Sequence, residues 1–303
     1  MQIIEKYTGC LLGLACGDAV GTTLEFLDRG TFTPIDDMVG GGPFHLEAGQ
    51  WTDDTSMALC LAHSLLSKND FDPVDQMNRY CNWSNYGYMS STGECFDIGV
   101  TVRSALNNYI LTKNPFSGSV NPRTAGNGAI MRLAPIPMFY GLNYELALKY
   151  SGESSRTTHA AEEAIECARL FGTLIYLALN GQSKEDILFN NQYIAHASKV
   201  IPLAKGAFIN KGVSDIKGTG YVIDSLEAAL WCFAHTNTYK EAVLKAANLG
   251  DDADTTAAIV GQLAGAYYGV SDIPTQWLDK LYMKQEIEEL ALGLFENRYR
   301  ASH

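Results

Sequence analysis

The chain has 303 residues, of which 47% are hydrophobic and 18% are charged, and its formal net charge is −12. This length allows a substantial core, in one large domain or in two ordinary ones. The excess of acidic residues argues against sequence-independent binding to nucleic acid or to anionic lipid. It does not exclude a small phosphate ligand held by backbone amides.

The first predicted helix covers residues 5–20 and carries a stripe of glycines. Gly9, Gly13, Gly17 and Gly21 are spaced four residues apart, so they share one face of the helix. Because glycine has no side chain, this face predicts that another backbone segment approaches closely.

Two acidic residues follow the glycine stripe. Asp18 interrupts the apolar helix, and the favoured interpretation is a buried carboxylate bonded to backbone amides. Glu25 comes one loop later, at the mouth of a helix end, where its carboxylate could reach a metal ion or a substrate. The next segment, residues 28–50, is too long and too rich in Gly and Pro to be a mere connector, and we expect it to border a site.

Helical periodicity dominates the rest of the chain, because apolar residues recur at i, i+3 and i+4 while alternating runs are scarce. The further predicted helices cover residues 53–67, 72–83, 97–111, 143–151, 160–180, 184–198, 222–235, 239–249, 255–268 and 284–299. No composition shift, flexible linker or repeat divides the chain. We therefore expect an all-α fold in a single compact domain over residues 1–303.

Several segments between these helices carry polar groups with two interpretations each. Asp97 is either a plain helix N-cap or a site residue. The loop around Asn127 and Gly128 is either an ordinary turn or a cradle of backbone N–H groups for phosphate. His159 either bonds neighbouring backbone or serves a site, and Tyr221 either begins a buried helix or stacks on a base.

Two acidic clusters are the most informative feature of the chain. Trp51-Thr52-Asp53-Asp54-Thr55 and Gly250-Asp251-Asp252-Ala253-Asp254-Thr255-Thr256 both run straight into an apolar helical pattern. One such cluster alone is commonly a helix cap, but together they supply more acceptors than capping uses. If the fold joins the two helix starts, their five carboxylates repel one another unless cations neutralise them. Oxygen-only ligands favour magnesium, manganese or calcium over zinc.

The cysteines and the beginning of the sequence bear on location. Seven cysteines are scattered along the chain without a Cys-x-x-Cys pair, as expected of small core residues in a reducing compartment. The first residues lack a basic-then-apolar secretory pattern, and the apolar stretch from Cys10 to Cys16 is too short to span a bilayer. We expect a cytoplasmic protein without membrane association, and a monomer by default.

Taken in order, these segments resemble the ADP-ribosylglycohydrolase family, which includes the dinitrogenase reductase activating glycohydrolases. The resemblance extends from Gly9 to about Gly269. The matching segments are Gly13-Leu14-Ala15-Cys16-Gly17-Asp18-Ala19-Val20-Gly21 with Glu25-Phe26, Trp51-Thr52-Asp53-Asp54-Thr55, Phe96-Asp97-Ile98-Gly99, Gly126-Asn127-Gly128-Ala129 with Met131-Arg132, Thr158-His159, Gly220-Tyr221-Val222 with Leu226-Glu227-Ala228-Ala229, and Gly250-Asp251-Asp252-Ala253-Asp254-Thr255. Seven motifs in the family's order are highly specific.

The resemblance implies an orthogonal helical bundle with a central cleft that holds two Mg²⁺ or Mn²⁺ ions. By the family pattern, the metal ligands are Thr52, Asp53, Asp54, Asp252, Asp254 and Thr255, with Asp254 bridging the ions. Glu25 matches a family glutamate that lies beside the metals.

The same resemblance implies the substrate contacts. The Asn127-Gly128 loop would hold the pyrophosphate of ADP-ribose, Tyr221 would face the adenine, and His159 is a further candidate for substrate binding. One residue departs from the pattern: the family often has Asn where this chain has Val100, which removes a polar contact near the ribose and leaves specificity in question.

The implied reaction is metal-dependent hydrolysis of the glycosidic bond between ADP-ribose and a modified acceptor, with ADP-ribosyl-arginine on protein as the first choice. Glu25 is the expected proton-handling carboxylate and Asp97 the runner-up. Two alternatives fit the same ligands: a two-metal phosphoesterase or nucleotide hydrolase, and a catalytically silent ADP-ribose-binding protein. The released product, ADP-ribose or else phosphate or AMP, discriminates between the two enzymatic alternatives.

Overall fold

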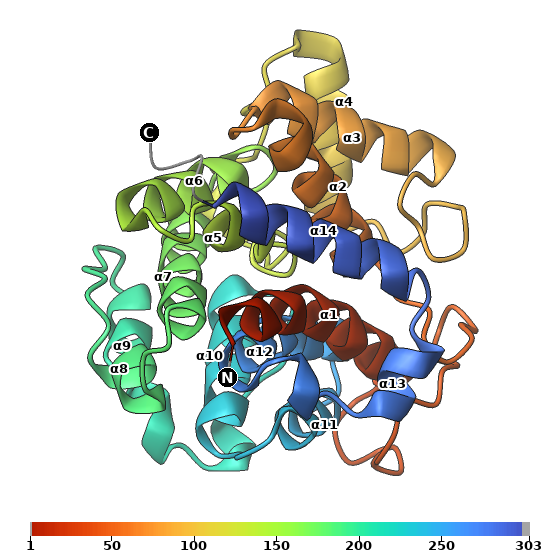
Figure 1. Cartoon of the computed structure of the whole chain (residues 1–303), viewed down its shortest axis with the longest axis vertical. Coiled ribbons are helices and arrows are strands. Elements are labelled where there is room, and N and C mark those ends of the chain that lie inside the picture. The colour runs from red at the N-terminus through yellow and green to blue at the C-terminus, as the bar shows by residue number, and fades with distance from the viewer. Residues whose placement is uncertain (1, 299–303) are drawn as a thin grey trace.

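The computed structural model describes residues 2–298, and this part of the chain is built from helices and loops (Figure 1). Within it, β-structure is limited to isolated bridges, such as the one that joins Gly126 to Tyr221. The predicted all-α fold is confirmed.

Fourteen α-helices and five short 3₁₀ helices are present in the described residues. The α-helices are α1 (Ile3–Gly21), α2 (Asp53–Lys68), α3 (Pro73–Tyr86), α4 (Val100–Thr112), α5 (Pro135–Phe139), α6 (Tyr144–Arg156), α7 (Glu162–Leu179), α8 (Lys184–Phe189), α9 (Val200–Ala204), α10 (Val222–Ala234), α11 (Tyr239–Ala247), α12 (Ala253–Tyr268), α13 (Thr275–Lys280) and α14 (Lys284–Asn297). The 3₁₀ helices are η1 (Thr22–Leu24), η2 (Pro122–Thr124), η3 (Ala207–Asn210), η4 (Val213–Asp215) and η5 (Val270–Asp272).

The centre of the molecule is the pair α1 and α12, which lie against each other in Figure 1. The glycine stripe of α1 makes this pairing possible. A Cβ atom added at Gly13 or Gly17 would press against the backbone carbonyl of Gly261 or Ala257 on α12. The predicted backbone approach is therefore real, and its partner is the helix that begins with the second acidic cluster.

The other helices cover this central pair. Helices α10 and α11 pack on α12, and α14 lies across α1 and α2 (Figure 1). A second, smaller apolar cluster joins α2, α3 and α4, with Met57, Tyr80 and Leu106 among its buried members. Helix α2 belongs to both groups, so it lies where the two apolar regions meet.

One long predicted helix is wrong beyond its first part. The prediction covered residues 184–198, whereas α8 ends at Phe189. After that point the side chain of Glu166 accepts hydrogen bonds from the backbone N–H groups of His196 (2.7 Å) and Ala197 (3.2 Å). A tertiary carboxylate thus replaces the helical acceptors that periodicity had implied.

The remaining differences are in short elements and boundaries. Helices α5, α9 and α13 have only five or six residues, too few for a periodic pattern, and were not predicted. The predicted helix at 284–299 corresponds to α14, and residue 299 lies outside the described residues. Among residues 2–298, none of the helices has both the length and the apolar character needed to cross a membrane.

Candidate metal centre and active site

The start of α2 is held by a carboxylate from another helix. Asp18, fully buried on α1, accepts hydrogen bonds at Oδ1 from the backbone N–H and hydroxyl of Thr52, both at 2.9 Å. Its Oδ2 accepts from the backbone N–H (3.0 Å) and hydroxyl (2.6 Å) of Thr55. The expectation of a buried carboxylate bonded to amides is confirmed, and Asp18 fixes the first turn of α2 relative to α1.

The start of α12 meets the start of α2 through two reciprocal hydrogen bonds. The hydroxyl of Thr52 lies 3.2 Å from Oδ2 of Asp254, and the hydroxyl of Thr255 lies 3.3 Å from Oδ1 of Asp54. The two acidic clusters, distant in sequence, are therefore neighbours, as the metal hypothesis requires.

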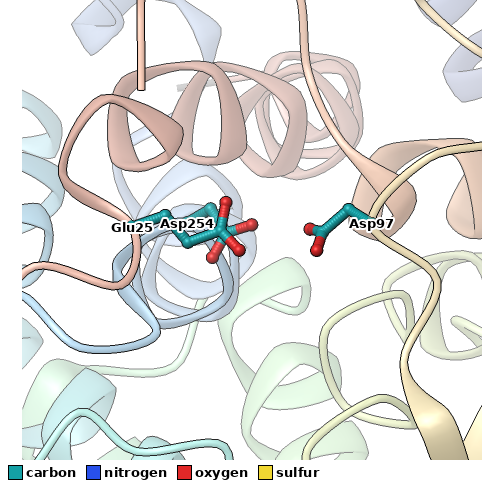
Figure 2. A group of neighbouring side chains, drawn as sticks. All are labelled: Glu25, Asp97 and Asp254. Atoms are coloured by element: carbon teal, nitrogen blue, oxygen red, sulfur yellow. The ribbon is translucent and has the colours of Figure 1, made fainter. Parts of the chain in front are cut away.

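Several carboxylate oxygens at this junction are buried without any hydrogen-bond partner in the described chain. They are Oδ2 of Asp54, Oδ1 of Asp254 and Oε2 of Glu25. Glu25 follows η1 and is only 3% exposed. Figure 2 shows the carboxylates of Glu25 and Asp254 side by side, with that of Asp97 facing them across a gap. One ligand oxygen from each of these three residues lies within 4.8 Å of the others.

Asp97 reaches this position through an unusual backbone conformation. It lies outside α4, which begins at Val100 with Gly99 as its N-cap, and its φ is +56°. The alternative interpretation of Asp97 as a helix N-cap is therefore wrong. A left-handed non-glycine residue is costly, and such residues concentrate at functional sites.

The electrostatics show how unfavourable this cluster is for bare carboxylates. Burial, together with repulsion from the neighbouring Asp97 and Asp252 carboxylates, raises the pKa of Glu25 to about 9. Burial and the same kind of repulsion raise the pKa of Asp97 to about 7, and hold the pKa values of Asp53, Asp54 and Asp254 well above the ordinary range. Each shift has the sign expected of anionic groups that lack a counter-charge.

The donor set fits a hard divalent cation. It consists of carboxylate and hydroxyl oxygens, and the three unpartnered buried oxygens supply acceptors that no donor of the described chain uses. The acidic cluster could therefore hold a metal ion.

A cavity of about 720 Å³ opens onto the acidic cluster. It is lined by Glu25, Phe26, Asp53, Asp97, Ile98, Gly99, Val100, Thr101, Val102, Gly126, Asn127, Gly128, Met131, His159, Thr219, Gly220, Asp251, Asp252 and Thr255. Most of the predicted site residues thus line one cavity, and Val100, the departure from the family pattern, lies in its wall.

The glycine loop supplies unused backbone donors on one side of this cavity. Asn127 anchors the loop: its backbone N–H donates to Gly220 O (3.1 Å), and its amide donates to Asp252 Oδ2 (2.7 Å). The backbone N–H groups of Gly128 and Ala129 have no acceptor among residues 2–298, although both residues are buried. Free, buried N–H groups in a tight loop are suited to an anion such as phosphate.

His159 lies beneath the same loop in a defined protonation state. A Cβ added at Gly128 would lie 2.6 Å from Cε1 of His159, so only glycine fits above the ring. Burial, with the nearby Arg132 cation, lowers the pKa of His159 to about 3, so its ring is neutral at physiological pH. Which ring nitrogen carries the proton is determined by its neighbours.

Those neighbours form a short relay. Arg132, fully buried, donates to Gly128 O and, at 2.7 Å, to Thr158 Oγ1. The Thr158 hydroxyl lies 2.9 Å from Nδ1 of His159. In the described chain, this nitrogen is the only hydrogen-bond partner of the hydroxyl besides Arg132. Since arginine only donates, Thr158 accepts from it, and the hydrogen of the Thr158 hydroxyl is left to donate to Nδ1. This arrangement favours the neutral tautomer of His159 that carries its proton on Nε2.

Tyr221 is placed differently from the other predicted substrate-binding residues, because it does not line the cavity. Its hydroxyl donates to the Glu163 carboxylate and accepts a hydrogen bond from Lys199 Nζ at 2.8 Å. Its backbone forms the bridge to Gly126, so it supports the glycine loop from outside. The adenine contact remains a prediction.

The sequence predictions gave no role to several residues of the site. Thr158 and Arg132 were named only within motifs, because a buried relay depends on tertiary contacts that no local pattern reveals. Phe26 and Ile98 line the cavity although the sequence signals there were the adjacent acids, Glu25 and Asp97. The signal that could have found Phe26 and Ile98 is their position in the sequence, directly beside a predicted catalytic acid.

Comparisons with known proteins identify relatives of this chain. A sequence model of the family described as ADP-ribosylglycohydrolase matches residues 1–303. A protein of Pseudomonas putida (strain GB-1) named ADP-ribosylarginine hydrolase Tri1 is 45% identical over 97% of this chain and 79% of its own length. The ADP-ribosyl-[dinitrogen reductase] glycohydrolase of Rhodospirillum rubrum is 32% identical over 95% of this chain and 94% of its own. A solved structure titled ADP-ribosylglycohydrolase-related protein complex superposes with a TM-score of 0.86, at 40% identity, covering 98% of this chain and 99% of that one.

Proposed function

Because this chain belongs to the ADP-ribosylglycohydrolase family, we propose that it hydrolyses the bond between ADP-ribose and an arginine side chain of a modified protein. The observation that supports arginine as the linked residue is the 45% identity, over nearly the whole chain, to a relative named ADP-ribosylarginine hydrolase. The reaction reverses ADP-ribosylation: water forms a bond to C1 of the ribose, the bond from C1 to the guanidine nitrogen breaks, and arginine leaves with a proton.

We propose that the junction of α2 and α12 holds two Mg²⁺ or Mn²⁺ ions. The residues that would bind them are Thr52, Asp53, Asp54, Asp252, Asp254 and Thr255. The buried, unpartnered oxygens of Asp54 and Asp254 support this assignment. When bound, such ions anchor the ribose hydroxyls and lower the pKa of a coordinated water.

Glu25 is the proposed proton acceptor for the attacking water. Its Oε2 is buried and free of hydrogen bonds in the described chain, and it lies beside Asp254 and opposite Asp97 (Figure 2). Nearby bound cations would favour the ionised form of this carboxyl, which can then take a proton from water as the oxygen bonds to C1. Asp97 faces the same gap and is the runner-up for this role.

The rest of the cavity would bind the ADP portion of the substrate. The N–H groups of Gly128 and Ala129 would donate to the pyrophosphate, and the Nε2–H of His159 adds a donor beneath them. Tyr221 is proposed to lie near the adenine. Binding energy from these remote contacts positions C1 at the acidic cluster.

The test is a linkage panel. The purified protein is incubated with arginine-ADP-ribosylated and serine-ADP-ribosylated proteins, after chelation and then with Mg²⁺ or Mn²⁺ restored, and released ADP-ribose is quantified. We expect release from the arginine linkage only when metal is present. Absence of ADP-ribose release from both linkages with metal present, or release of phosphate or AMP instead, would count against the proposal.

We also propose that the chain acts as one domain and as a monomer in a reducing compartment such as the cytoplasm. All seven cysteines are free, and five of them are buried, as suits structural thiols. Size-exclusion chromatography with light scattering checks the oligomeric state.

A further inference from the structure

Three phenylalanines form a connected group beside the cavity, here called the aromatic arc: Phe26, Phe44 and Phe96. The rings of Phe26 and Phe44 are 6.5 Å apart in an edge-to-face arrangement, and those of Phe44 and Phe96 are 5.1 Å apart. Phe26 lines the cavity, yet its side chain is 66% exposed. The proposed function gives no role to this exposed aromatic surface.

The aromatic arc is tied to the reacting end of the cavity. Phe26 directly follows Glu25, and Phe96 directly precedes Asp97. The carboxylates of Glu25 and Asp97 face each other across the gap in Figure 2, within 4.8 Å. The ring of Phe44 contacts those of Phe26 and Phe96, so the arc connects the two segments that carry the facing acids. The glycine loop and His159, which suit the ADP portion, line the same cavity.

The backbone holds Phe26 in place at a conformational cost. Its φ is +62°, a left-handed conformation that bulky residues rarely adopt. Two backbone hydrogen bonds maintain it: Phe26 N–H donates to Asp251 O at 2.7 Å, and Asp251 N–H donates to Leu27 O at 2.9 Å. Asp251 is also left-handed and also lines the cavity. This conformation keeps the Phe26 ring out of the core and at the cavity mouth. Backbone strain of this kind is concentrated at functional sites.

The charge of the cavity selects the ligand chemistry. Its lining includes the acidic side chains of Glu25, Asp97 and Asp251, which are outside the proposed ligand set, and no Lys or Arg among the described residues. A group seated between such carboxylates and an aromatic face is favoured if it is cationic. A guanidinium is a planar, weakly hydrated cation that stacks on aromatic rings.

We propose that the aromatic arc is the subsite for the guanidinium of the acceptor arginine, with Phe26 as its stacking platform. This inference rests on the proposed function, because the guanidinium is the group that leaves C1. It makes Phe26 a specificity-determining residue for the leaving group, separate from the residues that bind ADP-ribose.

The test separates the two halves of the substrate. Phe26→Leu removes the aromatic face and keeps apolar bulk, and Phe26→Trp keeps an aromatic face. We expect Phe26→Leu to raise the KM for ADP-ribosylarginine, and the Kd of N-methylguanidinium on ADP-ribose-saturated protein, by about two- to fivefold, the range of an exposed cation–π contact. Phe26→Trp should retain wild-type values, and the Kd of ADP-ribose should be unchanged in both variants.

A matched control is Tyr86→Ala, since Tyr86 is 79% exposed and lies outside the cavity lining. An unchanged Kd for N-methylguanidinium in Phe26→Leu, or an equal loss of ADP-ribose affinity, overturns the subsite. Failure of the wild-type protein to bind N-methylguanidinium overturns it as well. If the protein binds N-methylguanidinium through Phe26 but releases no ADP-ribose from arginine, the proposed function fails and the subsite stands.

Discussion

Asp18 and Thr158 each act through another residue. The Asp18 carboxylate accepts four hydrogen bonds, all from Thr52 and Thr55, so it positions the first turn of α2. Arg132 donates a hydrogen bond to the Thr158 hydroxyl, which leaves the hydrogen of that hydroxyl to point toward His159. Single buried hydrogen bonds contribute modestly to stability, but here they determine the direction in which neighbouring polar groups point.

Removing the Thr158 hydroxyl should allow His159 to populate its other neutral tautomer. In the wild type, we expect ¹⁵N NMR of the imidazole to show the neutral form protonated at Nε2. Because burial lowers the pKa of His159 to about 3, this signal should be constant from pH 5 to 8. Thr158→Val leaves Nδ1 without a donor, so the other tautomer becomes populated and ADP-ribose binds about two- to twelvefold more weakly, the equivalent of one lost hydrogen bond.

Thr158→Ser is the matched control for this change, because it retains the hydroxyl. It should give the wild-type spectrum and the wild-type Kd for ADP-ribose. A wild-type spectrum in Thr158→Val would show that the relay does not select the tautomer.

At the scale of elements, the pairing of α1 with α12 is what joins the two acidic clusters. Glycines on α1 face α12 with almost no space for a side chain, and Gly261 and Gly265 on α12 face α1 in the same way. Asp18 follows Gly17 directly, so the position of its carboxylate depends on this packing. A small separation of the two helices would therefore move the capping group of α2 away from its partners.

Gly17→Ala should destabilise the protein. The added Cβ presses on the carbonyl oxygen of Ala257, and overpacking of this kind costs about 1–3 kcal/mol, which exceeds the gain in helix propensity of about 1 kcal/mol. Gly293→Ala in α14 is the control, since its Cβ meets only the side chain of Leu66. Urea denaturation should show a lower free energy of unfolding for Gly17→Ala alone. Equal stability of the two variants would contradict this interpretation of the stripe.

At the scale of the whole molecule, the site is a junction of distant segments with a high density of negative charge. Because the buried carboxylates repel one another, a bound divalent cation should stabilise the folded protein beyond its role in the reaction. The stability of the molecule and the occupancy of the proposed centre are therefore linked.

Metal should raise stability, and Asp254→Asn should weaken this effect. At a hundred times its Kd, Mg²⁺ should increase the free energy of unfolding of the wild type by about 2.7 kcal/mol for each site that it fills. Without metal, Asp254→Asn should be more stable than the wild type, because one repelling carboxylate is gone. Its turnover should be lost, and its response to Mg²⁺ should be weaker than that of the wild type.

Asp279→Asn is the control for the change in charge, since Asp279 is exposed on α13. It should respond to Mg²⁺ as the wild type does. Calorimetry with and without chelator measures both effects. An undiminished Mg²⁺ response in Asp254→Asn would remove that residue from the proposed ligand set.

The sequence predicted the parts of this architecture that depend on local patterns. Both acidic clusters were recognised as helix starts, and the glycine spacing predicted a close helix partner. The end of α8 was missed because a distant carboxylate, Glu166, takes the backbone donors there. Asp97 was ambiguous because its left-handed backbone is not encoded in residue type alone. The position of Tyr221 outside the cavity wall depends on its contacts with Glu163 and Lys199.

The reciprocal hydrogen bonds between Thr52 and Asp254 and between Thr255 and Asp54 have a consequence for protein synthesis. Thr52 and Asp254 are 202 residues apart in the chain. At a translation rate of about 5–20 residues per second, the ribosome needs about 10–40 s to travel from one to the other. Throughout that interval the nascent polypeptide carries only half of the proposed ligand set. On this proposal, hydrolysis must await translation of α12, and a transcript cut short before that helix should yield an inert product.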